Sequence, residues 1–108
     1  MSIPNQRFLR NVSKEEAFYF FTSIGSYTGQ SATSLEEFLL RIKDINVNSL
    51  EFHLYRGDFE RWVTLTLGDA KLAEEIKNLR DMKVAGDAVR DRLYLIVSRH
   101  LKKLKGTN

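Results

Sequence analysis

The sequence lacks cysteine altogether, and its 108 residues include only one proline and one tryptophan. Without cysteine the chain has no disulfide, no thiolate metal ligand and no cysteine nucleophile. A long apolar run is also missing near the N-terminus, where the longest, at residues 17–21, cannot span a bilayer. No charged-then-apolar signal pattern opens the chain. We therefore expect a cytoplasmic protein that has no membrane partner.

Apolar residues are plentiful enough to fill a core. Hydrophobic residues make up 43% of the chain and aromatic residues 11%, a composition that argues against intrinsic disorder. A chain of this length suits one domain and is short for two. We expect a single compact domain over residues 13–105, with an extended N-terminal arm at 1–12 that Phe8 and Leu9 anchor, and a frayed tail at 106–108.

Positive charge is concentrated at the C-terminal end of the chain. Residues 87–108 hold six Lys or Arg against two Asp, a net charge of +4, whereas the remainder carries −1. Arg99, Lys102, Lys103 and Lys105 are therefore candidate contacts for a phosphate or another anion. Positive charge is also favoured at the C-terminal end of a helix by the helix dipole. The sequence leaves both interpretations open.

The N-terminal third gives conflicting local signals. Ser13 and Glu16 have the spacing of a capping box, which would begin a helix. The aromatic run at residues 18–22 is instead typical of a strand, and the two glycines within residues 24–29 indicate a turn. We expect a strand at 18–22, a turn at about 24–29 and a short return strand. A short helix is the alternative for the same residues.

Helical periodicity dominates the rest of the chain. Apolar residues recur every three or four positions over residues 35–45 and in four later segments, which begin at Ser49, Asp58, Asp69 and Asp87. The expected fold class is therefore mainly α, or α+β at most. We expect about five short helices packed with an N-terminal aromatic strand or small β-hairpin.

A Gly-Asp pair stands at three of the expected helix boundaries, at residues 57–58, 68–69 and 86–87. Glycine can take the left-handed conformation that ends a helix, and aspartate can cap the amide groups that open the next. We therefore expect a positive φ at each of these glycines and a capping carboxylate at each aspartate. By the same reasoning, the Thr-Ser pair at 33–34 would cap the first helix and Ser49 the second.

Six short motifs follow one another in a recognisable order. They are Thr28-Gly29, Ser34-Leu35-Glu36-Glu37-Phe38, Ser49-Leu50-Glu51-Phe52-His53, Asp58-Phe59-Glu60-Arg61-Trp62-Val63, Leu67-Gly68-Asp69 and Leu72-Ala73-Glu74. Over roughly residues 17–105 this order resembles a small uncharacterised prokaryotic domain family, archaeal and bacterial, of unknown function. The resemblance implies a shared fold and constellation but no activity. Many members look to have several histidines and an Asn before the Asp-Phe pair, whereas this chain has His53 alone and Gly57.

His53 and Asp58 form the sharpest candidate pair. An aspartate that orients an imidazole provides the geometry of a general base or a metal ligand. In the structural alternative, Asp58 caps its helix and His53 is a partly buried hydrogen-bonding residue. We favour the structural alternative and expect no metal and no cofactor, because His100 is the only other histidine and no third ligand is evident.

Aromatic residues supply the other candidates. Trp62 with Phe59 would form a platform for a base or a sugar, but their i, i+3 spacing on an apolar helix face favours packing in the core. Tyr27 and Thr28, beside Gly29, are better ligand candidates because packing explains turn residues less well. A turn that docks on the helices would also use them.

Together these features favour a small binding or accessory module that acts through contacts with an unidentified partner protein, and a homo-oligomer is compatible with this interpretation. The alternative is a weak nucleic-acid-associated protein that uses the basic C-terminal helix. The third hypothesis, an enzyme or metal site at His53 and Asp58, is disfavoured. No phosphate-cradling glycine loop, zinc-ligand spacing or nucleophile elbow is present in the sequence.

Overall fold

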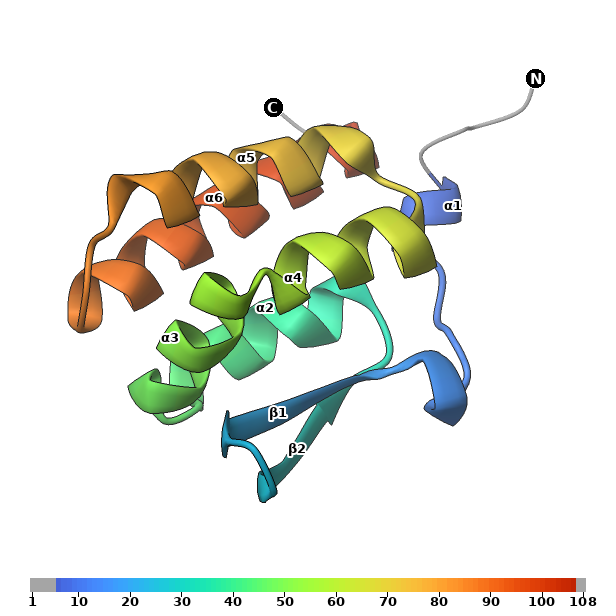
Figure 1. The fold of residues 1–108 in the computed structure, drawn as a ribbon. Helices are drawn as coiled ribbons and strands as arrows, with labels where there is room; N and C mark the ends of the chain where they lie inside the picture. Colours follow the sequence, from blue (N-terminus) through green and yellow to red (C-terminus); the bar gives the residue numbers. More distant parts are fainter. Residues whose placement is uncertain (1–5, 107–108) are drawn as a thin grey trace.

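The computed structural model describes residues 6–106 and shows a mainly α fold with one N-terminal β-hairpin, which confirms the expected fold class (Figure 1). The elements are α1 (Gln6–Leu9), η1 (Lys14–Glu16), β1 (Phe18–Ser23), β2 (Ser26–Ala32), α2 (Leu35–Asp44), α3 (Val47–Arg56), α4 (Asp58–Arg61), η2 (Trp62–Leu67), α5 (Ala70–Met82) and α6 (Asp87–Lys105). No helix among the described residues is long and apolar enough to cross a membrane.

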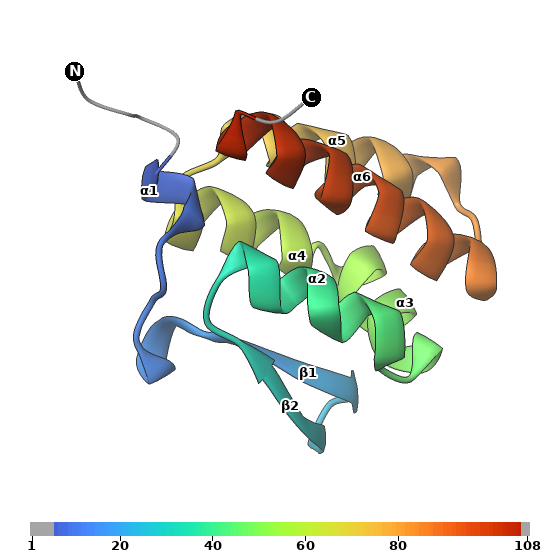
Figure 2. The same ribbon diagram turned by 180° about the vertical axis from the view of Figure 1, so that it is seen from behind.

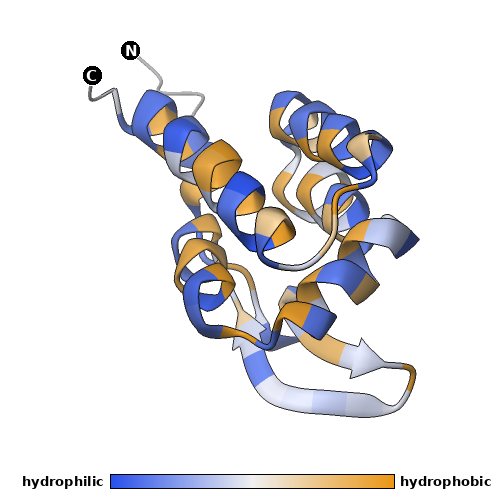
Figure 3. Ribbon diagram, turned by 90° about the vertical axis from the view of Figure 1, so that its left-hand side faces the viewer, coloured by the Kyte–Doolittle hydropathy of each residue, from blue (hydrophilic) through white to orange (hydrophobic). Residues whose placement is uncertain are grey.

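The hairpin and the α5–α6 pair lie at opposite ends of the molecule. Seen from two sides, β1 and β2 cover one end of the helices, and the antiparallel α5 and α6 cover the other (Figures 1 and 2). Every long helix carries both polar and apolar positions (Figure 3), and the apolar ones meet in a shared core. Phe20, Phe38 and Phe59 are fully buried there. The hairpin thus contributes one aromatic side to a core that the helices complete.

The strand prediction at residues 18–22 is confirmed, and the chain is not helical there. The turn, however, is shorter than predicted. Ser23 pairs with Ser26, so the loop contains two residues, and most of the expected turn at 24–29 belongs to β2. Gly29 has a φ of +87° and lies where the register between the strands shifts. Gly29 therefore belongs to a bulge within β2 and not to the turn. A bulge can require the same positive φ that a turn requires.

The helices α2 and α3 both begin after a side-chain cap, although the cap of α3 is not where the sequence suggests. Ser34 caps α2 by accepting a hydrogen bond from the backbone N–H of Glu37 at 3.1 Å. The cap of α3 is Asn46, whose Oδ1 accepts from the N–H of Asn48 at 2.8 Å. The prediction that Ser49 caps this helix is therefore wrong. Asparagine is an equally strong N-cap, and because it precedes the serine in the chain, Ser49 becomes a buried residue of the first turn.

All three glycines of the Gly-Asp pairs have positive φ, as predicted. Gly57 and Gly68 end helices in the left-handed conformation, with φ of 79° and 81°. Gly86 differs, since its ψ of −143° lies outside that conformation. The helix before it ends at Lys83, which is itself left-handed at a φ of 58°. Gly86 therefore precedes a helix and does not end one.

Only one aspartate of the Gly-Asp pairs caps its helix. Asp69 accepts a hydrogen bond from the backbone N–H of Leu72 at 3.1 Å, as predicted. Asp58 and Asp87 are instead the first residues of α4 and α6 and make no capping hydrogen bond, which corrects the prediction for both. At the first helical position a carboxylate still interacts favourably with the helix dipole. Its side chain is then available for other partners.

The N-terminal segment is more structured than an extended arm. Residues 6–9 form the short helix α1, and Phe8 and Leu9 pack partly buried against the core. Arg10 donates hydrogen bonds to the carbonyl oxygens of Thr66 and Leu67 at the end of the π-helical segment η2. It thereby satisfies carbonyl groups that a helix end leaves unpaired. Residues 1–5 of the predicted arm lie outside the described residues.

Two further predictions concern short segments. The expected capping box at Ser13–Glu16 gives only the single 3₁₀ turn η1, and the Ser13 side chain makes no capping hydrogen bond. At the other end, Gly106 ends α6 in the left-handed conformation, with a φ of 76°. Residues 107–108 of the predicted tail lie outside the described residues.

Candidate functional site: a groove between the hairpin and α3

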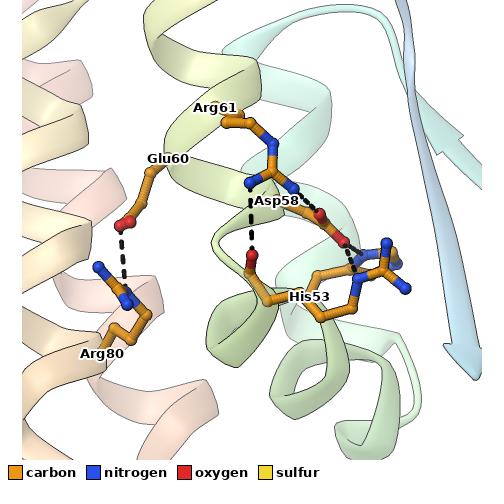
Figure 4. A network of polar contacts seen from close by, with 6 residues as sticks. His53, Asp58, Glu60, Arg61 and Arg80 are labelled. Atoms are coloured by element: carbon orange, nitrogen blue, oxygen red, sulfur yellow. Dashed lines mark hydrogen bonds and ion pairs between the residues drawn. The ribbon is translucent and has the colours of Figure 1, made fainter.

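His53 joins three elements through both nitrogens of its ring. Its Nδ1 lies 2.8 Å from Oδ2 of Asp58, the first residue of α4, and both side chains point toward one another (Figure 4). Its Nε2 lies 2.8 Å from the backbone nitrogen of Phe21 in β1. A backbone N–H can only donate, so Nε2 is the acceptor and the proton is on Nδ1. The imidazole is therefore neutral and held in one tautomer.

The surroundings of His53 favour this neutral form. The residue is buried, and its ring makes edge-on contacts with Phe18 and Phe52 at centroid distances of 4.8 and 4.9 Å. Burial lowers the pKa of His53 below its ordinary value of 6.5, and the hydrogen bond to Asp58 opposes this shift only in part. Protonation of Nε2 would also break the bond with Phe21.

This geometry leaves neither ring nitrogen of His53 without a hydrogen-bond partner. A general base or a metal ligand needs a free lone pair on the imidazole, and the lone pair of His53 is already occupied by the amide of Phe21. The described residues also contain no group of three or more His, Asp or Glu side chains placed to hold a metal ion. The structure thus brings His53 and Asp58 together as predicted, and it uses them to tie α3 and α4 to β1.

Asp58 is the centre of a polar network. It forms ion pairs with Arg61, one turn further along α4, and with Arg56 at the end of α3, whose Nε lies 3.2 Å from Oδ2. Nearby, Glu60 binds Nε of Arg80 at 3.2 Å and so links α4 to α5 (Figure 4). The sequence predicted a cap at Asp58. Its carboxylate instead binds the two arginines and the histidine.

Trp62 and Phe59 belong to the core and not to a surface platform. Trp62 is 7% exposed, and Phe59 is fully buried. The indole Nε1 of Trp62 donates a hydrogen bond to the carbonyl oxygen of Glu16 at 2.8 Å. Phe18 contacts the rings of both Trp62 and His53, at 5.8 and 4.8 Å between centroids. Trp62 therefore supports the site from inside.

Tyr27 and Thr28 lie on β2 and differ in what they do. The hydroxyl of Thr28 donates to the carbonyl oxygen of Phe20 at 2.7 Å and accepts from the N–H of Gln30 at 3.1 Å. It thus replaces strand hydrogen bonds where the register shifts. The ring of Tyr27 packs on Phe21 at 5.2 Å and is 47% exposed. Tyr27 extends the aromatic surface of the hairpin, whereas Thr28 maintains its backbone.

An open groove of about 430 Å³ lies between β1, the hairpin loop and α3. Its lining residues are Phe18, Tyr19, Phe21, Ser23, Ile24, Gly25, Phe52, His53, Arg56 and Asp58. Ile24, at the tip of the hairpin, is 84% exposed. The guanidinium of Arg56 lies 4.8 Å from the centre of the Phe52 ring, a cation–π contact on the groove wall. The groove is therefore largely apolar, and its charged lining residues are Arg56 and Asp58.

Sequence reasoning missed most of this groove. Phe52 and Arg56 are four residues apart, and the i, i+4 spacing that places them together on one helix face was a usable signal. Ile24, an aliphatic residue in a hairpin loop, was another. No signal in the sequence indicated that β1 lies beside α3. That arrangement depends on tertiary packing.

The basic residues of α6 are only partly gathered on one face. Arg99 lines a shallow hollow between α5 and α6, whereas Lys105 forms an ion pair with Glu36 of α2. Lys102 and Lys103 are exposed and, at three and four residues after Arg99, lie beside it on the helix surface. All four lie on the helix pair at the opposite end of the molecule from the hairpin (Figure 1). They are therefore separate from the groove.

Comparison of the chain with protein-family models, curated proteins and solved structures gives no match. The resemblance to an uncharacterised prokaryotic family therefore stays a prediction. Function has to be argued from the groove itself.

Proposed function

We propose that this chain is a small binding module that acts through contacts with a partner protein, and that the groove between β1 and α3 is its contact surface. The observation that carries the proposal is an open, largely apolar groove that four aromatic residues line, namely Phe18, Tyr19, Phe21 and Phe52. Phe21, Phe52 and Arg56 are of the residue types that are enriched at protein interfaces.

The state of His53 supports a binding role over catalysis. Its two nitrogens are both hydrogen-bonded within the protein, and Asp58 is surrounded by two arginines. Such an arrangement fixes the relative positions of Phe21 and Phe52, since one belongs to the strand that His53 binds and the other precedes His53 on α3. A preformed groove of this kind reduces the entropic cost of binding.

Nucleic-acid binding through α6 is the weaker alternative. A phosphate track requires cations gathered on one accessible face. Arg99 and Lys105 instead lie toward different neighbouring helices, and Lys105 already pairs with Glu36. We therefore rank protein contact first.

Site-specific photo-crosslinking in the native host tests the proposal. A photo-crosslinking phenylalanine analogue replaces Ile24 at the groove, and in the control it replaces Leu65, which is 77% exposed and outside the groove. We expect one or a few defined protein adducts from position 24 and none from position 65. An adduct of twice the chain's mass would identify a second copy as the partner. Equal labelling at both positions, or none at position 24, would contradict the proposal.

A further inference from the structure

The charges beside the groove are unequally exposed. The side chains of Arg56 and Arg61 are 47% and 58% exposed, whereas that of Asp58, which they both contact, is 16% exposed. His53 adds no charge because it is held neutral by Phe21. The solvent and any ligand therefore meet two guanidinium groups and very little of the carboxylate between them.

The neighbouring charged residues do not neutralise the positive charge of Arg56 and Arg61. Glu60, which lies next to Arg61, is itself 16% exposed and paired with Arg80. These ion pairs form one cluster of three arginines and two carboxylates: Arg56, Arg61, Arg80, Asp58 and Glu60. Both carboxylates are largely buried. Its net charge is positive, and its accessible part is formed by guanidinium groups.

Arg56 lies where this charge meets the apolar wall. Its guanidinium lies over the ring of Phe52 and also contacts Asp58, which limits its freedom to move. A planar guanidinium presents several N–H donors and matches a carboxylate in a bidentate geometry. With one face against an aromatic ring, it is partly shielded from water, which strengthens its interaction with an anion.

We propose that the occupant of the groove is a short segment of a partner protein that carries an apolar side chain next to an acidic residue. The apolar side chain packs against Phe21, Phe52 and Ile24, and the carboxylate binds Arg56. This inference rests on the proposed function, and it specifies the chemistry of the partner.

The segment is recognised through its side chains and not as an added strand. One edge of β1 pairs with β2, and on the other the N–H of Phe21 is taken by His53. The outer strand β2 is irregular at Gly29, and the carbonyl oxygen of Ser31 accepts a hydrogen bond from Arg41 at 2.8 Å. Bulges and covered carbonyls are features that protect a sheet edge from pairing.

Peptide selection tests this inference without knowledge of the partner. A phage-displayed library of random twelve-residue peptides is selected on the immobilised chain, and the enriched peptides are synthesised with a fluorophore for anisotropy titrations. We expect enriched sequences with Phe, Leu or Ile within a few residues of Asp or Glu. Their dissociation constants should rise roughly tenfold in Arg56→Gln, the loss expected of one charge-assisted contact. Arg99→Gln, which removes the same charge at the far end, should leave them unchanged.

A second variant, Ile24→Ser, distinguishes failure of this inference from failure of the proposed function, because Ile24 is an exposed apolar residue of the groove. Peptides without carboxylates whose binding is weakened by Ile24→Ser but not by Arg56→Gln would overturn the inference alone. Peptides unaffected by both substitutions, or no enriched peptide, would overturn both. A fluorescent single-stranded RNA that binds and is weakened by Arg56→Gln would overturn the inference in favour of a nucleic-acid ligand. Circular dichroism melts confirm that each variant remains folded.

Discussion

The imidazole of His53 accepts a hydrogen bond from the backbone N–H of Phe21, with 2.8 Å between the two nitrogens. This bond joins β1 to α3 beside the groove, where the ring of His53 also packs against Phe18 of β1. It exists only while Nε2 is unprotonated. Asp58 favours that tautomer because its Oδ2 accepts a hydrogen bond from Nδ1–H. His53 thus connects the β1 side of the candidate site to α3 and α4 through its two ring nitrogens.

Replacement of His53 by alanine should destabilise the fold by roughly 2–4 kcal/mol, because it leaves the Phe21 N–H and the Asp58 carboxylate without their buried partner and creates a small cavity. Urea denaturation followed by circular dichroism measures this change. Arg99→Ala is the exposed control and should fall within about 0.5 kcal/mol of wild type. A His53→Ala variant as stable as that control would show that the bridge is unimportant.

Acidification should destabilise the protein through the same residue. Burial lowers the pKa of His53 in the folded state, so below about pH 6.5 the unfolded chain binds more protons than the folded one. The stabilisation is present above that pH and is lost as the pH falls through the folded-state pKa. Urea midpoints at several pH values, for wild type and His53→Gln, isolate the contribution. The wild-type advantage should shrink toward acid, and an advantage that grew would contradict the assignment of a neutral imidazole.

Trp62→Ala should cost roughly 3–5 kcal/mol, as truncation of a large buried aromatic residue does. Trp62→Phe should cost less, because the ring is largely kept and only the hydrogen bond to the carbonyl oxygen of Glu16 is lost. Denaturation midpoints compare the two variants. Since this is the single tryptophan, its fluorescence maximum reports burial directly. A fluorescence maximum typical of solvent-exposed tryptophan, together with little loss of stability, would contradict the burial of Trp62.

Gly68→Ala should destabilise by about 1–2 kcal/mol, the cost of a left-handed conformation for a residue with a Cβ atom. Gly68 has a φ of 81°, and an added Cβ would meet no atom within 4 Å, so backbone strain alone sets the expected loss. Gly68→Asn is the matched control and should lose less, because asparagine tolerates this conformation better. Equal losses for Ala and Asn would argue against this explanation.

Duplex and single-stranded oligonucleotides should bind weakly, in the micromolar range or above, as expected of phosphate contacts alone. Anisotropy titrations at about 50 and 200 mM salt measure both affinity and its salt dependence. The control replaces Lys102, Lys103 and Lys105 with alanine. Nanomolar binding at the higher salt that this triple variant abolishes would make nucleic acid the main partner.

Local patterns in the sequence were enough for most of the fold. The i, i+3 and i, i+4 periodicity that defines the long helices is a short-range property, and so is the left-handed glycine at each of two helix ends. The caps were harder to predict, since Asn46 and Ser49 are both good N-caps and only the folded chain selects the first. Lys83 shows the same limit, because a lysine gives no sequence signal for a left-handed residue.

The candidate site was only half visible in the sequence. His53 and Asp58 are five residues apart across one helix junction, and proximity in the chain was enough to predict their contact. Phe21 is 32 residues from His53, so its amide as the second partner of the imidazole could not be foreseen. That long-range bond joins β1 to α3 at the groove. The sequence favoured the structural interpretation for lack of further metal ligands, and that interpretation stays a prediction.

Mapping the bound peptide by NMR tests the central claim most directly. A ¹⁵N-labelled sample is titrated with the tightest peptide from the selection, and the amide shifts are followed residue by residue. If the groove between β1 and α3 is the contact surface, the largest shifts will fall within residues 18–25 and 52–58, and the amides of α5 and α6 will stay in place. Shifts centred on α5 and α6, with the amides of Phe21 and Arg56 unchanged, would contradict it.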